Sequence, residues 1–169
     1  MKRGFTLIEL LVVMIIVGVL VTIALPKYRA SLERGRAMEG MANLRAASDW
    51  INTQYILHGN SYTDAAPYFT VSETNASGTT TTTIGNLTRS MYFTTPTVEG
   101  SCTATTCSIS TYRRQGTTNY YKLVAHNENG RLDYITCPKG GGTQISLCAA
   151  IGLTPYMEGT SNTFYKITF

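Results

Sequence analysis

The chain begins Met1-Lys2-Arg3-Gly4-Phe5-Thr6-Leu7-Ile8-Glu9, and the apolar run that starts at Phe5 continues to Leu25 with Glu9 as its one charged residue. As a helix that rises about 1.5 Å per residue, residues 5–25 would be about 31 Å long, close to the thickness of a bilayer core. A secretory signal has a shorter apolar region followed by a small-residue cleavage site. Here the small residue, Gly4, comes first. We therefore predict that residues 5–25 can span a membrane.

Glu9 is the residue in this run that most needs an explanation. A charged side chain at full depth in a bilayer costs on the order of 2.5–3.5 kcal/mol or more, so it normally has a partner. No basic residue lies between Phe5 and Pro26. The partner must be a lipid head group, the chain's own amino end or a neighbouring subunit.

The segment Gly4-Phe5-Thr6-Leu7-Ile8-Glu9-Leu10-Leu11-Val12-Val13 resembles the prepilin signature of type IV pilins and type II secretion pseudopilins. The likeness continues through Gly18, Pro26 and Tyr28. It implies that a membrane-bound aspartyl peptidase cuts between Gly4 and Phe5 and methylates the new amino end at Phe5. It also implies that Glu9, with Thr6 and Phe5, directs the assembly of subunits.

The expected fold is the α+β pilin fold, in which a long helix has a transmembrane first half and a second half packed on a C-terminal antiparallel sheet. We expect a leader peptide at residues 1–4 and a helix at residues 5–58. The helix divides into an assembly segment at residues 5–25 and an amphipathic part at residues 27–58. A globular head follows at residues 59–169, with a variable loop region at residues 59–114 and the sheet at residues 115–169.

The second half of the predicted helix is amphipathic, because its apolar residues recur at steps of three or four or their multiples. This stripe, which we expect to pack on the head, contains Tyr28, Leu32, Met38, Met41, Leu44, Ile51 and Tyr55, broadened by Ala37, Ala42, Ala46, Ala47 and Trp50. The charged residues between them are interpreted as a solvated face, on which Lys27, Arg29, Arg34, Arg36 and Arg45 outnumber Glu33 and Glu39.

Three positions are expected to disturb or end the helix. Pro26 lacks an amide hydrogen and disfavours a regular helix interior by about 3 kcal/mol, which predicts a bend or a loosened turn. Gly18 weakens the helix by up to about 1 kcal/mol relative to alanine. The resemblance to type IV pilins also implies that residues 18–26 lose helicity in filaments. Gly59, followed by Asn60, is a typical stop signal after His58.

The head is predicted from turn and strand signals. Residues 61–114 are rich in Thr, Ser, Gly and Asn, which is typical of an exposed connection with at most a short strand at Met91–Phe93. Asn129-Gly130 favours a hairpin between strands at Asn119–His126 and Arg131–Thr136. Alternation at Phe164–Phe169 predicts a last strand whose inner face meets the helix.

Four cysteines, Cys102, Cys107, Cys137 and Cys148, allow three pairings if all are bridged. We favour the two pairs that are local in sequence, each of which would add roughly 2–3 kcal/mol of stability. A zinc site is the alternative, but neither spacing is of the close Cys-x-x-Cys type. Cys137 and Cys148 also resemble the C-terminal disulfide-bounded loop of many type IV pilins.

Composition and motifs argue against other classes of function. The formal net charge of +4 includes Lys2 and Arg3 of the leader and is too small to indicate nucleic acid as the main partner. His58 and His126 lack a nucleophile or acid at a motif spacing, so we predict no enzyme activity and no cofactor or metal.

The resulting prediction is a structural subunit of a type IV pilus that polymerises through its helix. Its partners would be identical or related pilin subunits, prepilin peptidase, inner-membrane assembly machinery and, before assembly, membrane lipid. It would lie in the inner membrane as a single-pass precursor and then in an extracellular pilus. The alternatives are a type II secretion pseudopilin in a periplasmic filament and, more remotely, a single-span anchored enzyme or receptor.

Overall fold

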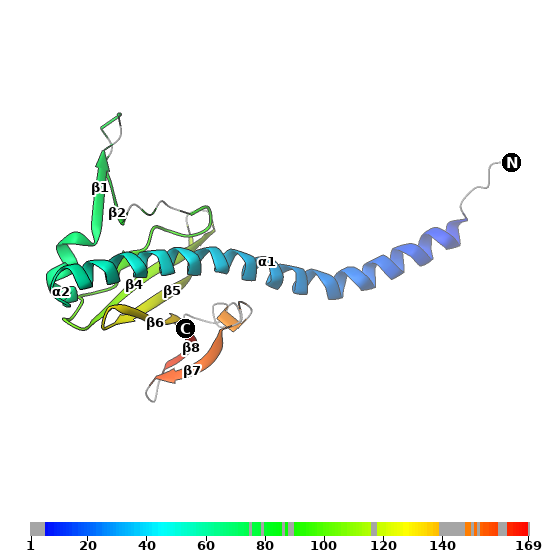
Figure 1. Cartoon of the computed structure of the whole chain (residues 1–169). Coiled ribbons are helices and arrows are strands. Elements are labelled where there is room, and N and C mark those ends of the chain that lie inside the picture. The colour runs from blue at the N-terminus through cyan, green and yellow to red at the C-terminus, as the bar shows by residue number, and fades with distance from the viewer. Residues whose placement is uncertain are drawn as a thin grey trace.

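The computed structural model describes residues 6–74, 76–78, 80–85, 87, 90–115, 118–138, 148–149, 151, 153–158 and 162–168. One long helix, α1 (Leu7–Leu57), runs out of a head that is built around its C-terminal half (Figure 1). The head contains an antiparallel sheet. The α+β prediction is confirmed, because a long apolar helix precedes an antiparallel β region.

Helix α1 begins after Thr6 and ends at Leu57, close to the predicted bounds. Gly59 and Asn60, with φ of +82° and +56°, supply the left-handed backbone that ends it. The helix continues through Pro26 without a break in its assignment and is curved rather than straight (Figure 1). The loss of helicity expected between Gly18 and Pro26 is therefore not a property of this single subunit.

The head sheet has six strands in the order β3-β4-β5-β6-β8-β7, and every neighbouring pair is antiparallel. The strands are β3 (Thr97–Val98), β4 (Thr106–Gln115), β5 (Thr118–Glu128), β6 (Arg131–Cys137), β7 (Thr154–Glu158) and β8 (Asn162–Thr168). Asn129 and Gly130 form the predicted β5–β6 turn, with φ of +50° and +79°. The inner face of the sheet covers α1.

The connection after α1 is more structured than predicted. It contains α2 (Tyr62–Ala65), the 3-10 turn η1 (Ala66–Tyr68) and a separate two-stranded ribbon of β1 (Thr70–Thr74) and β2 (Thr80–Ile84). It also contains β4, a long interior strand of the head sheet, so the sheet begins well before residue 115. The short strand expected at Met91–Phe93 is reduced to one bridge between Phe93 and Arg113.

The core lies between the second half of α1 and the sheet. Met41, Leu44, Ile51 and Tyr55 of the predicted stripe are buried, and Ala37 and Ala47 join them. The start of the stripe is different. Tyr28, Leu32 and Met38 are exposed, as are Ala42 and Ala46, because the head covers only one face of α1 and does not extend over the helix before Glu33.

A buried polar chain also ties the helix to the head. The Tyr62 hydroxyl donates to Asn52 Oδ1 at 2.6 Å, and Asn52 Nδ2 donates to Asn127 Oδ1 at 3.2 Å. The Gly130 N–H donates to the Tyr62 hydroxyl oxygen at 3.1 Å. Burial raises the pKa of Tyr62 to about 12, so this phenol stays protonated at ordinary pH.

Cys102 is bonded to Cys107, as predicted, and Cys137 is bonded to Cys148. The Cα atoms of the two pairs are 4.5 and 6.0 Å apart. The first bridge closes the turn that leads into β4. The second joins the end of β6 to Cys148, which is buried in the core, as is Ile151.

Candidate functional site: the amino end of the long helix

The first half of α1 has no head around it. Leu7 and Ile8 are 89% and 71% exposed, and Val17 and Leu25 are still 48% and 45% exposed. The helix is long and apolar enough to cross a membrane by length and composition. Water does not solvate so continuous an apolar surface favourably, since each exposed Å² costs about 25 cal/mol relative to burial. This half of α1 therefore requires either lipid or other apolar helices around it.

Thr6 and Glu9 form a capping box at the start of this helix. The Thr6 N–H and hydroxyl donate to Glu9 Oε2 at 3.0 and 2.8 Å, and the Glu9 N–H donates to Thr6 Oγ1 at 3.4 Å. Thr6 itself has extended backbone angles, φ −81° and ψ 151°. The reciprocal bonds satisfy main-chain donors that every helix start leaves without partners. Thr6 and Glu9, which the sequence analysis named together as assembly residues, are thus hydrogen-bonded to each other within one chain.

The capping box uses only one of the two carboxylate oxygens. Within the part of the chain that the structure describes, Glu9 Oε1 accepts no hydrogen bond. Gly4 and Phe5, the predicted cleavage and methylation residues, lie outside the described residues. Among the described residues, this geometry holds Glu9 in position at the helix start and leaves Oε1 available to a further cation.

Gly18 and Pro26, the predicted flexible positions, lie on the exposed part of α1. A side chain added at Gly18 would meet nothing within 4 Å. Val21, Ala24, Leu25 and Tyr28 line a shallow apolar hollow just before and after Pro26. No head residue that the structure describes restrains this segment, so its behaviour depends on what surrounds the helix.

The structure also reveals an ion cluster at the base of the head that the sequence analysis missed. Arg113 Nε donates to Glu33 Oε1 at 2.7 Å, and Arg113 Nη2 to Glu33 Oε2 at 3.3 Å. The Tyr121 hydroxyl donates to Oε1 and Arg36 Nη1 to Oε2, both at 3.2 Å. The guanidinium groups of Arg36 and Arg113 also lie over the ring of Tyr92, at 4.9 and 5.2 Å, respectively, from its centroid. The interpretation of Glu33 as part of a solvated face was wrong.

Glu33 is ionised in this cluster. Burial by itself disfavours the carboxylate, but the hydrogen bonds and charge of Arg113 and the bonds from Arg36 and Tyr121 outweigh it, so the pKa of Glu33 is lowered. The side chains of Glu33 and Arg113 are 10% and 5% exposed. The cluster fixes how the head sits on α1, and hence where the head lies relative to the apolar half of the helix.

A signal for this cluster was present in the sequence. Glu33 precedes Ala37, Gly40 and Leu44 at helical spacing, so it continues the buried stripe rather than the solvated face. Helical spacing could not predict the partner of Glu33, because Arg113 lies 80 residues away in the chain.

Residues 1–25 match the family described as the prokaryotic N-terminal methylation motif. The amino end of the chain carries this motif. The capping box of Thr6 and Glu9 lies within the matched segment. The exposed apolar surface of α1 up to Leu25 lies within it as well.

Curated relatives extend the likeness beyond the motif. The chain is 36% identical over 59 residues to the type IV major pilin protein PilE1 of Neisseria gonorrhoeae, an alignment that covers 35% of this chain and 36% of that protein. It is equally identical over 59 residues to a fimbrial protein of Neisseria meningitidis serogroup B. It is 43% identical over 42 residues to the type IV major fimbrial protein FimA of Dichelobacter nodosus, which covers 25% of this chain and 26% of that protein.

The chain thus matches about a third or less of the length of these relatives. No solved structure matches it. The likeness to these relatives therefore concerns the amino-terminal part of the chain. The head is characterised by its structure alone.

Proposed function

We propose that this protein is a structural subunit of a type IV pilus, and that it polymerises through α1. The observation that carries the proposal is the combination of the methylation motif at residues 1–25 with a helix whose first half is exposed and, apart from Glu9, almost entirely apolar. The relatives named as type IV major pilins and fimbrial proteins favour a pilus over a secretion pseudopilus. Catalysis has no place in this proposal.

Before assembly, the apolar half of α1 lies in the inner membrane. The leader with Lys2 and Arg3 remains on the cytoplasmic side, as the prepilin resemblance implies, although the larger number of basic residues from Lys27 to Arg45 would by charge count alone favour the opposite orientation. Prepilin peptidase removes residues 1–4 and methylates Phe5. The new terminal amine keeps its positive charge. The chain is then ready to leave the bilayer for a filament that the membrane assembly machinery extends to the cell exterior.

In the filament, the apolar halves of neighbouring helices replace lipid around one another. Because both environments are apolar, hydrophobic transfer contributes little to choosing between them, and directional polar contacts decide the register of the subunits. The Phe5 amine of one copy forms an ion pair with the Glu9 carboxylate of its neighbour. Glu9 Oε2 remains bonded to Thr6 while Oε1 accepts the incoming charge, and the low dielectric of the setting strengthens the attraction.

Analysis of sheared surface fibres tests this proposal. Cells that express the chain are sheared, and the released material is imaged by electron microscopy and analysed by intact-mass spectrometry. We expect fibres whose main component starts at Phe5 and carries one additional methyl group. A chain that retains Met1 and is recovered only as dispersed membrane protein would contradict the proposal. Fibres found only in the periplasm would instead favour the pseudopilin alternative.

A further inference from the structure

The β1–β2 ribbon is an arm that leaves the body of the head (Figure 1). Its root is firmly held: Ile84 is buried, and Phe69 O accepts hydrogen bonds from the Gly85 N–H at 3.2 Å and from Trp50 Nε1 at 3.0 Å. Beyond the root, only Val71 and Thr83 are even half-buried. A two-stranded ribbon by itself is marginally stable in water, so an arm of this kind gains stability from a further strand.

The arm lacks the features that normally prevent edge strands from pairing with another chain. Native edges are often protected by lysine, proline, bulges or a covering segment. The two strands contain neither lysine nor proline, and Glu73 is their only charged residue. Their register is continuous from Thr70–Ile84 to Thr74–Thr80, with no bulge. Hydroxyl pairs between the strands, Ser72 with Thr82 at 2.8 Å and Thr74 with Thr80 at 2.9 Å, align them further.

A second strand edge lies at β3, the first strand of the head sheet. The Glu99 N–H donates to Ser108 O of β4 at 2.8 Å. Because bonding alternates along an antiparallel pair, the N–H and C=O of the preceding residue, Val98, point away from β4. In the described part of the chain, the head sheet has no strand on that side of β3. The main-chain groups of Val98 are therefore placed to receive an additional strand.

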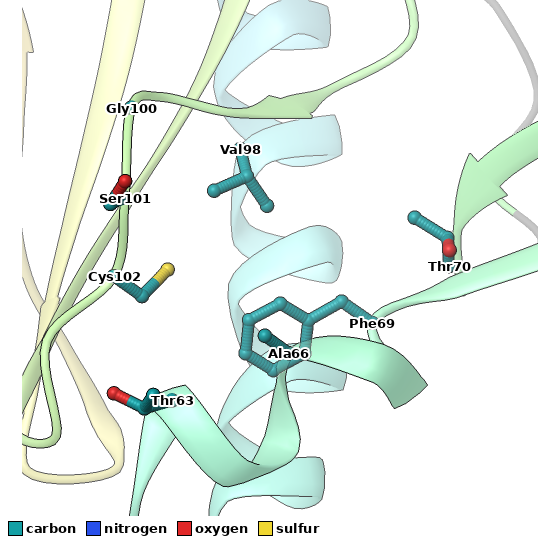
Figure 2. Close-up of a pocket in the computed structure, with 8 residues that line it drawn as sticks. All are labelled: Thr63, Ala66, Phe69, Thr70, Val98, Gly100, Ser101 and Cys102. Carbon is teal, nitrogen blue, oxygen red and sulfur yellow. The ribbon is translucent and has the colours of Figure 1, made fainter.

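A cavity of about 370 Å³ lies beside this edge. Val98 and Cys102 line it from the sheet side, and Phe69 and Thr70 line it from the root of the arm (Figure 2). Thr63 and Ser101 contribute hydroxyl groups (Figure 2). None of the lining residues is charged. The cavity is thus uncharged and lined by apolar and hydroxyl side chains, as is the arm apart from Glu73.

We propose that the arm of one copy lies along β3 of a second copy and places its side chains in this cavity. The inference rests on the proposed function, since a filament supplies copies at a fixed repeat. Each copy donates its arm to one neighbour and offers its own β3 edge, with the cavity beside it, to another. Each copy therefore uses two different surfaces. Such a head-to-tail contact extends into an open filament when its rotation does not close a ring. Main-chain hydrogen bonds supply affinity, and the small side chains of the arm fit the cavity.

Cross-linking between singly substituted copies tests the contact. Thr81→Cys or Thr82→Cys, which lie on opposite faces of the arm, is co-expressed with Ser101→Cys carried on a separate copy. All three positions are exposed, so none of the substitutions alters the buried core. Sheared filaments are treated with a short thiol-specific bifunctional reagent. We expect covalent dimers that contain one copy of each variant from at least one arm position, and no comparable dimers from filaments of any single variant.

Hydrogen exchange on the unsubstituted protein is the second measurement. The amides of β1 and β2 should exchange at least about tenfold more slowly in filaments than in subunits dispersed in detergent, because a third strand protects them. Intact filaments that give neither mixed dimers nor this protection would overturn the inference and leave the proposed function standing. An unsubstituted chain that forms no filament would overturn the proposed function, and this inference with it.

Discussion

Glu33 of the long helix and Arg113 of β4 lie 80 residues apart in the chain and are joined by a hydrogen bond of 2.7 Å between Oε1 and Nε. This pair marks the point where α1 enters the head. On one side of it the helix is bare and apolar, and on the other side it is covered by the sheet. This nearly buried ion pair and its neighbours thus add to the apolar core and to the Asn52 hydrogen bonds in orienting the head on its helix.

Replacement of Arg113 by alanine should destabilise the head by about 3–5 kcal/mol, because it leaves the carboxylate of Glu33 buried without its main partner. The free energy of unfolding is measured by denaturant titration of the full chain in detergent micelles. Arg34→Ala is the control, since Arg34 is an exposed cation one residue from Glu33 and should change stability by less than about 0.5 kcal/mol. Equal effects of the two substitutions would contradict the assigned role of Arg113.

The Glu33 cluster should also make stability depend on pH in the acid range. The folded-state pKa of Glu33 is lowered, so its contribution is fully present above the unfolded value of 4.5 and is lost as the pH falls through the folded value. The stability difference between the unsubstituted protein and Glu33→Gln should thus stay constant from about pH 7 to about pH 5 and narrow below it. A difference that narrows above pH 5 would require another titrating group.

Two glycines of α1 should respond in opposite directions to alanine. A Cβ at Gly40 would lie 2.6 Å from the ring of Phe93, which is buried, so Gly40→Ala should cost about 1–3 kcal/mol through overpacking. A Cβ at Gly35 would meet nothing within 4 Å, so Gly35→Ala should stabilise the helix by up to about 1 kcal/mol. Thermal unfolding followed by circular dichroism measures both. A stabilising Gly40→Ala would show that Phe93 does not hold the helix and sheet in close approach.

Substitutions at Glu9 separate its charge from its capping role. Glutamine also serves in a capping box, so Glu9→Gln should keep the helix start while it removes the charge that would meet the Phe5 amine. We expect both Glu9→Gln and Glu9→Ala to be cleaved normally, with the filament yield reduced by at least about tenfold because the charge that sets the register is lost. Yield is measured in the sheared fraction and cleavage by intact mass. Normal assembly of Glu9→Gln would indicate that capping, and not charge, is what the filament requires.

The sequence was informative wherever a pattern was local. The apolar run, the Asn129-Gly130 hairpin and the stop at Gly59 depend on neighbouring residues, and each has the predicted position in the structure. The Cys102–Cys107 bridge, which is also local, is present. Local rules were sufficient in these cases because main-chain geometry and short loops determine the outcome.

Where the outcome depends on tertiary contacts, the sequence was insufficient. Residues 106–115 carry threonine, serine and arginine and lack a clear alternation, yet β4 becomes an interior strand because β5 pairs along nearly its whole length. Tyr28 and Leu32 continue the apolar spacing but stay exposed, since the head does not reach them. The role of Glu33 required knowledge of a strand 80 residues away.

The capping box has a consequence for proteolysis. Because Thr6 satisfies the helix start from an extended backbone, α1 begins at Leu7 and needs nothing from the residues before it. The bond between residues 4 and 5 therefore precedes the first helical turn, and a peptidase would not have to unwind any of α1 to bind it. Removal of the leader would leave the shape of the rod unchanged and alter only its charge at the tip.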